Sequence, residues 1–403
     1  TGQVVYEHNP GMALRPASVV KLLSSALALK REGDSLTYTT KVFYTGEIDE
    51  GRLSGNIVIQ AGGDPTLDSK YFPKACFMDS LVSKVVSLGI KRIHGNIIIE
   101  TEGEPARVPG SWPWEDVANY YGALYHSFNY RDNTYTINLK TKVVSVVPSV
   151  PGVKLRNEVM ASAKNGNDAW IYGGPEAATL LIQGTIPANR SSFAVKGAIH
   201  HPDACFRAEL EKRLKGKGIT LDKQKIEDGE RHALLTTVSP FLKDIVYYTN
   251  KNSINLFAEA LGELISPTDY ARTVKAELSG MGIDSCGITL KDASGLSPAN
   301  AVPAEVFTDL LIWAKGHLSD VFVASLPQGN VDWGLRIYSD HPILRGNILA
   351  KTGSMSGVRA LAGYLKTQRG ETLAFTILVN NYVGDPVKVQ EIIRDLLKEF
   401  ADK

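Results

Sequence analysis

The sequence is poor in features that assign a protein to the disulfide-rich or membrane-spanning classes. Its 403 residues include only three cysteines, Cys76, Cys205 and Cys286. Three thiols are too few for a disulfide framework, and their odd number leaves at least one unpaired within the chain. No apolar run approaches the roughly 18 residues of a membrane-spanning helix. We therefore expect no transmembrane segment, and the cysteines leave the redox compartment open.

An excess of charge of one sign is also missing. Lys and Arg together number 44 against 43 for Asp and Glu, a formal net charge of +1. This balance removes the electrostatic reason to expect nucleic acid or an acidic membrane as a partner. The eight histidines are scattered, His200 and His201 are adjacent rather than at ligand spacing, and there is no glycine-rich phosphate loop. We expect neither a metal nor a cofactor.

The composition is that of a globular protein, with 43% hydrophobic and 22% charged residues. The length favours two or three domains. The chain opens at Thr1 without a basic and then apolar leader, so we expect that any export signal was removed or never present.

The order of the predicted elements indicates an α/β unit interrupted by a β-rich insertion. A short strand over 3–6 and a helix over 17–30 come first, and a late block predicts helices at 241–248, 254–265, 270–281 and 304–315. Strands at 348–351, 360–365 and 373–380 and a helix at 386–400 close the chain. We expect 1–36 and 235–403 to form one discontinuous domain, with 37–234 inserted as two small domains.

The insertion is expected to be mainly β-structure. The predicted strands are 36–44, 55–60, 95–100, a pair over 135–147, 179–186 and 193–199. Helices are predicted at 79–88 and 203–215, and the first of these gives a local strand–helix–strand order.

Ser18 and Lys21 stand three residues apart at the start of the first predicted helix. This spacing places the hydroxyl and the amine on one helix face. A lysine held neutral by burial or by a second cation can act as the general base for a neighbouring hydroxyl. The backbone N–H groups of the helix start also suit a developing oxyanion. Taken alone, the pair is weak evidence, and a capping serine followed by a solvated lysine is the more common meaning of this spacing.

Two further short patterns follow in the chain. Ser253 and Asn255 open an apolar helix, where the serine is a good N-cap candidate and the pair could instead relay a proton and hold an amide. Lys351, Thr352 and Gly353 lie at the end of a predicted strand. The lysine and the threonine could bind a carboxylate, and the glycine permits close approach of a backbone.

The three patterns together, Ser-x-x-Lys, Ser-x-Asn and Lys-Thr-Gly in this order, are the combination of penicillin-binding proteins and β-lactamases. The sequence resembles the penicillin-recognising serine acyltransferases and, within them, the low-molecular-mass class C D-alanyl-D-alanine carboxypeptidase/endopeptidases. Four other segments support the narrower resemblance: Gly62–Leu67, Trp112–Asp116, Asp292–Ser297 and Ser325–Pro327. The long interval between Ser18 and Ser253 matches that family's inserted domains.

The resemblance implies a role for each motif residue. Ser18 would be the nucleophile and Lys21 its base, and the fold would be the penicillin-recognising α/β fold. Ser253 and Asn255 would relay protons and bind the substrate. The substrates would be peptidoglycan stem peptides, with β-lactams as inhibitors, and such a polymer implies an exported, periplasmic enzyme.

The third motif would bind the end of the substrate. Lys351 and Thr352 would anchor the terminal carboxylate of D-Ala, beside Gly353. The backbone N–H groups of Ser18 and Ser354 would form the oxyanion hole. A second cation at Lys351 would help to keep Lys21 neutral.

The sequence departs from the family's pattern in one segment. Ala293 replaces a usual glycine, and Pro298 stands where an arginine commonly binds the free carboxylate of diaminopimelate. Asp116 matches an acidic position that can take the diaminopimelate amine. Half of the expected side-chain recognition is therefore in doubt.

Two other functions stay open at this stage. A serine β-lactamase would need a dedicated deacylation base, and the nearest glutamates, Glu259 and Glu263, are expected on the outer face of their helix. Tyr248-Thr249-Asn250 could also be taken for the Tyr-x-Asn form of the second motif. The other possibility is a wall-binding homologue that kept the fold but lost turnover.

Overall fold

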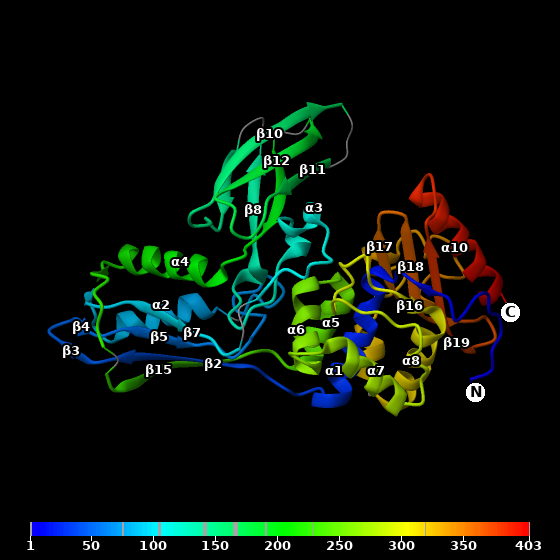
Figure 1. Ribbon diagram of the computed structural model, residues 1–403, viewed down its shortest axis with the longest axis horizontal. Helices are drawn as coiled ribbons and strands as arrows, with labels where there is room; N and C mark the ends of the chain where they lie inside the picture. Colours follow the sequence, from blue (N-terminus) through cyan, green and yellow to red (C-terminus); the bar gives the residue numbers. More distant parts are fainter. Residues whose placement is uncertain are drawn as a thin grey trace. The chain divides into compact units, whose positions relative to one another are not determined.

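The structure is a computed structural model that describes residues 2–74, 76–103, 106–139, 143–163, 168–189, 192–227, 229–318 and 320–402 (Figure 1). It divides into two compact units. Unit 1 comprises Thr1–Leu36, Pro109–Trp112 and Phe241–Lys403, and unit 2 comprises Thr37–Val108 and Pro113–Pro240. The boundary expected before residue 235 falls inside a strand of unit 2, so unit 1 resumes later, at Phe241.

A central buried helix organises unit 1. The 3₁₀ turn η1 (Ala17–Val20) continues into α1 (Lys21–Glu32), where the sequence predicts one helix. Every residue from 21 to 29 is buried, and the helices packed around α1 share its apolar core. These are α5 (Leu242–Asn252), α6 (Asn255–Ile265), α7 (Tyr270–Gly280), α8 (Ala304–His317) and α9 (Asp320–Ser325).

An antiparallel sheet in the order β17-β18-β19 completes unit 1. Its strands are β17 (Ile348–Met355), β18 (Val358–Lys366) and β19 (Thr372–Asn380). Alternate residues of β18 enter two different cores, Ala360 and Ala362 facing the helices around α1 and Leu361 facing α10 (Pro386–Ala401). Figure 1 shows the sheet with helices on both sides. This sandwich fixes the register of the strand that carries Lys351.

The predicted strand over 3–6 is wrong. Residues 3–6 have no regular structure, and Val4, Val5 and Tyr6 are each more than half exposed. A β-prone sequence without a partner strand has no ladder to join. The N-terminal pairing lies instead between β1 (Ala13–Leu14) and β16 (Val302–Pro303), and a short turn η4 (Trp333–Leu335) precedes β17.

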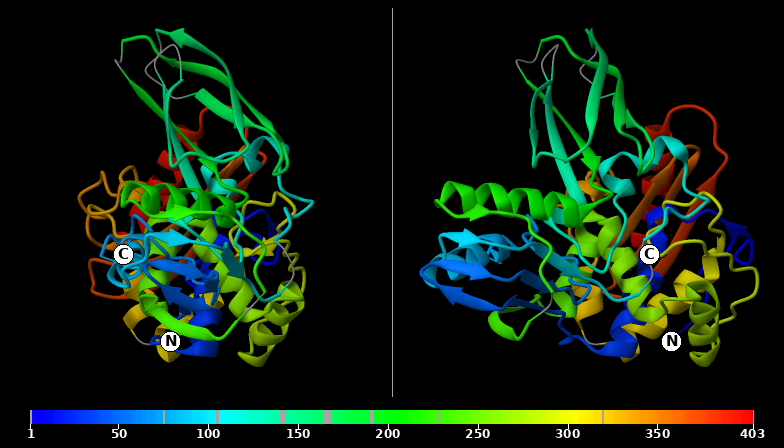
Figure 2. Two further views of the ribbon diagram at one scale, coloured as in Figure 1. Left: turned by 90° about the vertical axis from the view of Figure 1, so that its left-hand side faces the viewer. Right: turned by 60° about the vertical axis from the view of Figure 1, so that its left-hand side comes forward.

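Unit 2 contains two four-stranded sheets near its helices. The first has the order β15-β2-β5-β7 and consists of β15 (Arg231–Val238), β2 (Thr39–Thr45), β5 (Ile57–Gln60) and β7 (Ile97–Glu100). The second has the order β14-β6-β4-β3 and consists of β14 (Thr220–Leu221), β6 (Arg92–Ile93), β4 (Arg52–Ser54) and β3 (Glu47–Asp49). The helices α2 (Phe77–Ser87) and α4 (Pro202–Gly216) share one core with both sheets. Figure 2 shows α4, in green, lying alongside this part of unit 2.

The predicted strand–helix–strand unit forms as expected. Strands β5 and β7 pair in parallel and α2 connects them. Strand β15 was not predicted, because its exposed and buried residues do not alternate strictly and a bulge between Ala233 and Leu235 interrupts its register.

Two three-stranded sheets with a separate core make up the rest of unit 2. They have the orders β13-β8-β9 and β10-β12-β11. Their strands are β8 (Thr134–Leu139), β9 (Val143–Val147), β10 (Lys154–Ser162), β11 (Asp168–Tyr172), β12 (Thr179–Pro187) and β13 (Phe193–Ala198). Strands β10 and β11 were not predicted, and 140–142, inside the predicted pair over 135–147, lie outside the described residues. The short turns α3 (Trp114–Val117), η2 (Tyr120–Gly122) and η3 (Arg131–Asn133) complete the unit.

Candidate active site

The turn η1 presents Ser18 at the surface of an otherwise buried segment. Ala17, Val19 and Val20 are buried, whereas Ser18 is partly exposed. Ala17 adopts a φ of 45°, a left-handed conformation that is uncommon for a residue with a side chain. A strained residue held by tight packing just before a partly exposed hydroxyl is typical of a functional turn.

Lys21, in the first turn of α1, is fully buried and has three polar neighbours. Its Nζ lies 3.0 Å from Ser18 Oγ and 2.7 Å from Asn255 Oδ1, and it donates to the backbone carbonyl of Ser294. Burial lowers the pKa of Lys21 from 10.5 to about 7, although the carboxylates of Asp292 and Glu259 act in the opposite direction.

These neighbours suit a neutral amine. The Asn255 Oδ1 and the Ser294 carbonyl can only accept, so they take the two N–H groups of a neutral lysine. Ser18 Oγ, 3.0 Å from Nζ, is the third partner of the amine, and a neutral amine at this distance can accept a proton from a hydroxyl.

Ser253 lies between two helices and does not cap the second. It ends α5 with a left-handed φ of 55°, and Ile254 is the N-cap residue of α6, without a side-chain cap. The capping role considered for Ser253 is therefore wrong. Its Oγ instead accepts a hydrogen bond of 3.0 Å from Lys351 Nζ. Because the oxygen receives this bond, the hydroxyl proton of Ser253 is free to be donated elsewhere.

Lys351 is buried on β17, between the buried Ala350 and the partly exposed Thr352. Its Nζ also donates to the backbone carbonyl of Thr352, at 2.8 Å. Burial lowers the pKa of Lys351 well below its usual value, and the positive charge of Lys21 lowers it further. Thr352 is partly exposed and Ser354 is exposed, so both are accessible at the strand edge.

The glycine at position 353 is required for packing within the protein as well as for the approach of a ligand. A Cβ built on it would lie 2.5 Å from the Pro16 carbonyl oxygen and 3.2 Å from the Val19 nitrogen. The glycine therefore lets β17 pack directly against η1, which brings the third motif beside the first.

Burial, rather than the second cation, is the main cause of the low pKa of Lys21. The expected burial effect is therefore the main one, and the expected additional help from Lys351 is not among the causes that lower the pKa of Lys21. Lys21 acts mainly on Lys351, whose pKa it helps to lower.

The expectation that Glu259 lies on the outer face of its helix is wrong. Its carboxylate accepts backbone N–H groups from Ser294, at 2.9 Å, and from Ala293, at 3.3 Å. Burial, followed by the nearby Asp292, raises its pKa. The signal that could have found it is its spacing: it stands four residues after Asn255, on the same face of α6. Glu263 is exposed, as expected.

Asp292 organises the loop that carries Ser294. Its buried carboxylate accepts from the backbone N–H groups of Gly295, at 2.8 Å, and Ser297, at 2.6 Å. It also accepts from the indole Nε1 of Trp112, at 2.8 Å. Pro298 follows in an exposed stretch of the same loop.

Asp116 belongs to unit 2 and is not among the residues that these contacts bring together. It lies on α3 and accepts a hydrogen bond of 3.0 Å from the Tyr121 hydroxyl. Burial raises the pKa of Asp116 above its usual value.

The alternative second motif, Tyr248-Thr249-Asn250, faces the interior of unit 1. Thr249 and Asn250 are fully buried, and the Asn250 side chain bonds to Ser25 and Ser325. Asn255, and not Asn250, reaches Lys21. The geometry therefore favours Ser253 and Asn255 as the second motif.

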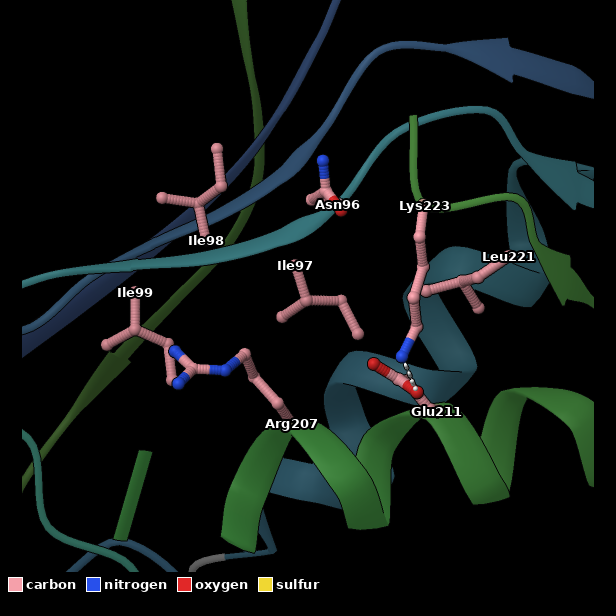
Figure 3. A pocket seen from close by; sticks show the side chains of 8 residues that line it. All are labelled: Asn96, Ile97, Ile98, Ile99, Arg207, Glu211, Leu221 and Lys223. Carbon is pink, nitrogen blue, oxygen red and sulfur yellow. Dashed lines mark ion pairs between the residues drawn. The ribbon is translucent and has the colours of Figure 1, made fainter. Parts of the chain in front are cut away.

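A hollow with a volume of about 440 Å³ lies away from these residues, in unit 2. Figure 3 shows Ile97 and Ile99 of β7 on the side of Arg207 and Glu211 of α4, whereas Ile98 points the opposite way. The two cations of the hollow, Arg207 and Lys223, are already paired with Asp203 and Glu211. Among the described residues, no cluster of His, Cys, Asp and Glu could hold a metal ion. No helix in the described ranges could cross a bilayer.

Comparison with known proteins decides the family. The sequence profile of the D-Ala-D-Ala carboxypeptidase 3 (S13) family matches residues 1–403. The chain belongs to this family. Like the family, it is a serine-type peptidase, which confirms the predicted D-Ala-D-Ala carboxypeptidase resemblance and enzyme class.

Relatives of the S13 family match along nearly the whole chain. The D-alanyl-D-alanine carboxypeptidase of Actinomadura sp. strain R39 is 26% identical over 446 residues, covering 100% of this chain and 80% of that protein. The carboxypeptidase DacB of Haemophilus influenzae is 25% identical over 415 residues, covering 95% and 84%. The crystal structure of H. influenzae penicillin-binding protein 4 superposes with a TM-score of 0.81, at 24% identity, over 100% of this chain and 94% of that one. The predicted α/β fold with a β-rich inserted region is thus confirmed.

Proposed function

We propose that the protein hydrolyses the D-Ala-D-Ala bond of peptidoglycan stem peptides through an acyl-enzyme at Ser18, and that β-lactams acylate the same residue. The observation that carries the proposal is the contact of 3.0 Å between the buried Lys21 amine and the partly exposed Ser18 hydroxyl. An amine with a pKa of about 7 is substantially neutral at physiological pH and can accept the hydroxyl proton.

Acylation then proceeds with the atoms in place. Lys21 Nζ takes the Ser18 proton as Ser18 Oγ attacks the carbonyl carbon of the penultimate D-Ala. The backbone N–H groups of Ser18 and Ser354 stabilise the oxyanion. As the C–N bond of D-Ala-D-Ala breaks, Ser253, whose oxygen accepts from Lys351, donates its proton to the departing amine, and the proton held on Lys21 returns to Ser253. Asn255 orients both Lys21 and the substrate amide. Water then attacks the acyl-enzyme, which releases the shortened peptide and restores the Ser18 hydroxyl.

The third motif holds the terminal carboxylate of the substrate. Thr352, at the accessible edge of β17, donates a hydrogen bond to it. A carboxylate bound beside Lys351 favours the charged ammonium, which offsets the effect of burial on its pKa. Substrate binding and protonation of Lys351 are therefore coupled.

Asp116 is proposed to receive a side-chain amine of the stem peptide, as diaminopimelate provides. We propose that the free carboxylate of diaminopimelate has no arginine partner in this protein, because Pro298 stands where the family commonly has that arginine. Activity on cross-linked peptides, an endopeptidase reaction, uses the same acyl-enzyme. Such a polymer lies outside the cytoplasmic membrane, so we place the protein in the periplasm.

The test is the intact mass of the protein after incubation with benzylpenicillin. One adduct should form, peptide mapping should place it on Ser18, and Ser18→Ala should abolish it. The exposed Ser87, replaced by alanine, is the matched control and should leave labelling unchanged. An adduct on another serine contradicts the proposal.

The lifetime of the adduct separates this peptidase from a β-lactamase. The opened β-lactam ring stays tethered and blocks the approach of water, whereas D-Ala departs. We expect the adduct to persist for minutes or longer, a barrier above about 20 kcal/mol. Loss within a second after removal of free penicillin would favour the β-lactamase.

A further inference from the structure

Glu259 is a partly buried carboxylate that the reaction described above does not use. It lies on α6, one turn after Asn255, and points at the loop after Asp292. Its two oxygens accept the N–H groups of two consecutive peptides, those of Ala293 and Ser294. A carboxylate that accepts two consecutive backbone N–H groups fixes the orientation of both peptide planes.

The carbonyl oxygens of the same two residues are held from the opposite side, by α1. The Ser24 hydroxyl donates to the Ala293 carbonyl at 3.1 Å, and Lys21 Nζ donates to the Ser294 carbonyl. The Ala293–Ser294 segment is thus hydrogen-bonded on one side to Glu259 of α6 and on the other to Ser24 and Lys21 of α1. The Ser294 carbonyl is one of the two acceptors that set the direction of the Lys21 amine.

Close packing leaves this segment little freedom to move. A Cβ built on Gly262 of α6 would lie 2.6 Å from the Ala293 Cβ. A Cβ built on Gly295, whose φ is 85°, would lie 2.0 Å from the Ala17 carbonyl oxygen. Glycines at both places let the segment fit between α6 and the turn that carries Ser18.

We propose that Glu259 is a positioning residue for the catalytic base. By fixing the Ala293–Ser294 peptides it directs the Ser294 carbonyl at Lys21, and so aims the electron pair of Lys21 at Ser18. This inference rests on the proposed roles of Ser18 and Lys21. Without Glu259, two buried N–H groups lose their acceptor and the segment turns to satisfy them. The Ser294 carbonyl then leaves its position beside Lys21.

A negative charge at Glu259 has a second, separable effect on the base. It favours the ammonium form of Lys21, as does the neighbouring Asp292, while Lys351 is the other charged group near the amine. Replacing Glu259 by a neutral residue therefore shifts the acidic limb of the acylation rate to lower pH. A residue that only stabilises the fold has no such effect on the limb.

The experiment compares Glu259→Gln and Glu259→Ala with the wild type. The matched control is Glu263→Gln, one turn further along α6, because Glu263 is exposed. The rate constant for benzylpenicillin adduct formation is measured by intact mass from pH 5 to pH 9, together with thermal unfolding. Misplacing a reacting group by about 1 Å costs on the order of 10²-fold in rate.

We expect Glu259→Ala to acylate on the order of 10²-fold more slowly than the wild type on the alkaline plateau. Glu259→Gln, which keeps one acceptor oxygen, should lose less, and its acidic limb should lie at lower pH. Rates within twofold of the wild type in both variants would overturn the proposal. So would a uniform loss with an unmoved limb. If Glu259→Ala does not fold, the isosteric Gln variant decides by the same two criteria.

Failure of the proposed function gives a different result. A wild-type protein that takes no adduct on Ser18 removes the role of Ser18 itself. The Glu259 proposal fails where the wild type labels at Ser18 and the variants either label equally well or lose rate uniformly with an unmoved limb.

Discussion

The pH dependence of acylation follows from the buried position of Lys21 and gives a quantitative test. At pH 7, an ordinary lysine with a pKa of 10.5 is neutral in only about one molecule in 3,000, whereas a pKa of about 7 makes about half of the molecules neutral. Burial therefore raises the fraction of usable base by about 10³-fold.

The sign of the dependence follows from the proposed role of the amine. In the proposed mechanism only neutral Lys21 accepts the Ser18 proton, so acylation is expected to rise with pH through about 7 and to be constant above it. At pH 6 the rate should be about a tenth of the plateau, and at pH 5 about a hundredth. The assay is the second-order rate constant of benzylpenicillin labelling, followed by intact mass at each pH.

Lys21→Met, which keeps an unbranched side chain of similar length, separates this base from other groups. The variant should label roughly 10² to 10⁴-fold more slowly than the wild-type plateau. Lys84→Met, at an exposed position of α2, is the control and should keep the wild-type profile. A Lys21→Met variant with the same limb near pH 7 and a similar rate would refute the assignment.

Three other expectations follow from the same structure. Lys351→Ala should slow donors with a terminal carboxylate far more than their carboxyl-amidated analogues in a turnover assay; equal losses would contradict the anchoring role. Asp116→Ala should lower hydrolysis of diaminopimelate-containing muropeptides and spare short donors without the side-chain amine, and unchanged selectivity would return Asp116 to an ordinary loop carboxylate. Burial lowers the pKa values of His126 and His200 to about 4. Between about pH 6.5 and pH 4 these histidines therefore take up protons only in the unfolded chain, and the free energy of unfolding should fall as the pH falls through this range. Buried Asp64, with a pKa raised to about 6, offsets part of this loss, and thermal unfolding of His200→Leu should show a shallower pH slope.

The sequence predicts those elements whose signal is local. The helix over 386–400 and the strands over 360–365 and 373–380 form within a few residues of their expected bounds. Each carries its own apolar periodicity and buries a defined face. The three motifs were also found locally, because each consists of neighbours in the chain.

The strands missed by the prediction depend on partners distant in sequence. Strand β10 has few buried residues and is completed by its parallel pairing with β12. Strand β15 closes a sheet with β2, almost 200 residues earlier. Neither has a strong local pattern, so tertiary pairing overrides a weak propensity.

The site shows the same division between local and distant causes. The sequence identifies Ser18 and Lys21, but the Lys21 amine donates to Asn255 and to the Ser294 carbonyl, both more than 230 residues away. The low pKa of Lys21 has its main cause in burial, which is a property of the whole packed unit rather than of the motif.

The Trp112 indole supports the loop beside Lys21 from a segment that is distant in sequence. Pro109–Trp112 leaves the inserted region and belongs to unit 1, where the Trp112 Nε1 donates to Asp292. The same carboxylate holds the backbone of Gly295, next to the carbonyl that receives Lys21. Residues 109–112, although they lie between two stretches of unit 2 in the chain, thus help to hold the loop whose Ser294 carbonyl accepts a hydrogen bond from Lys21.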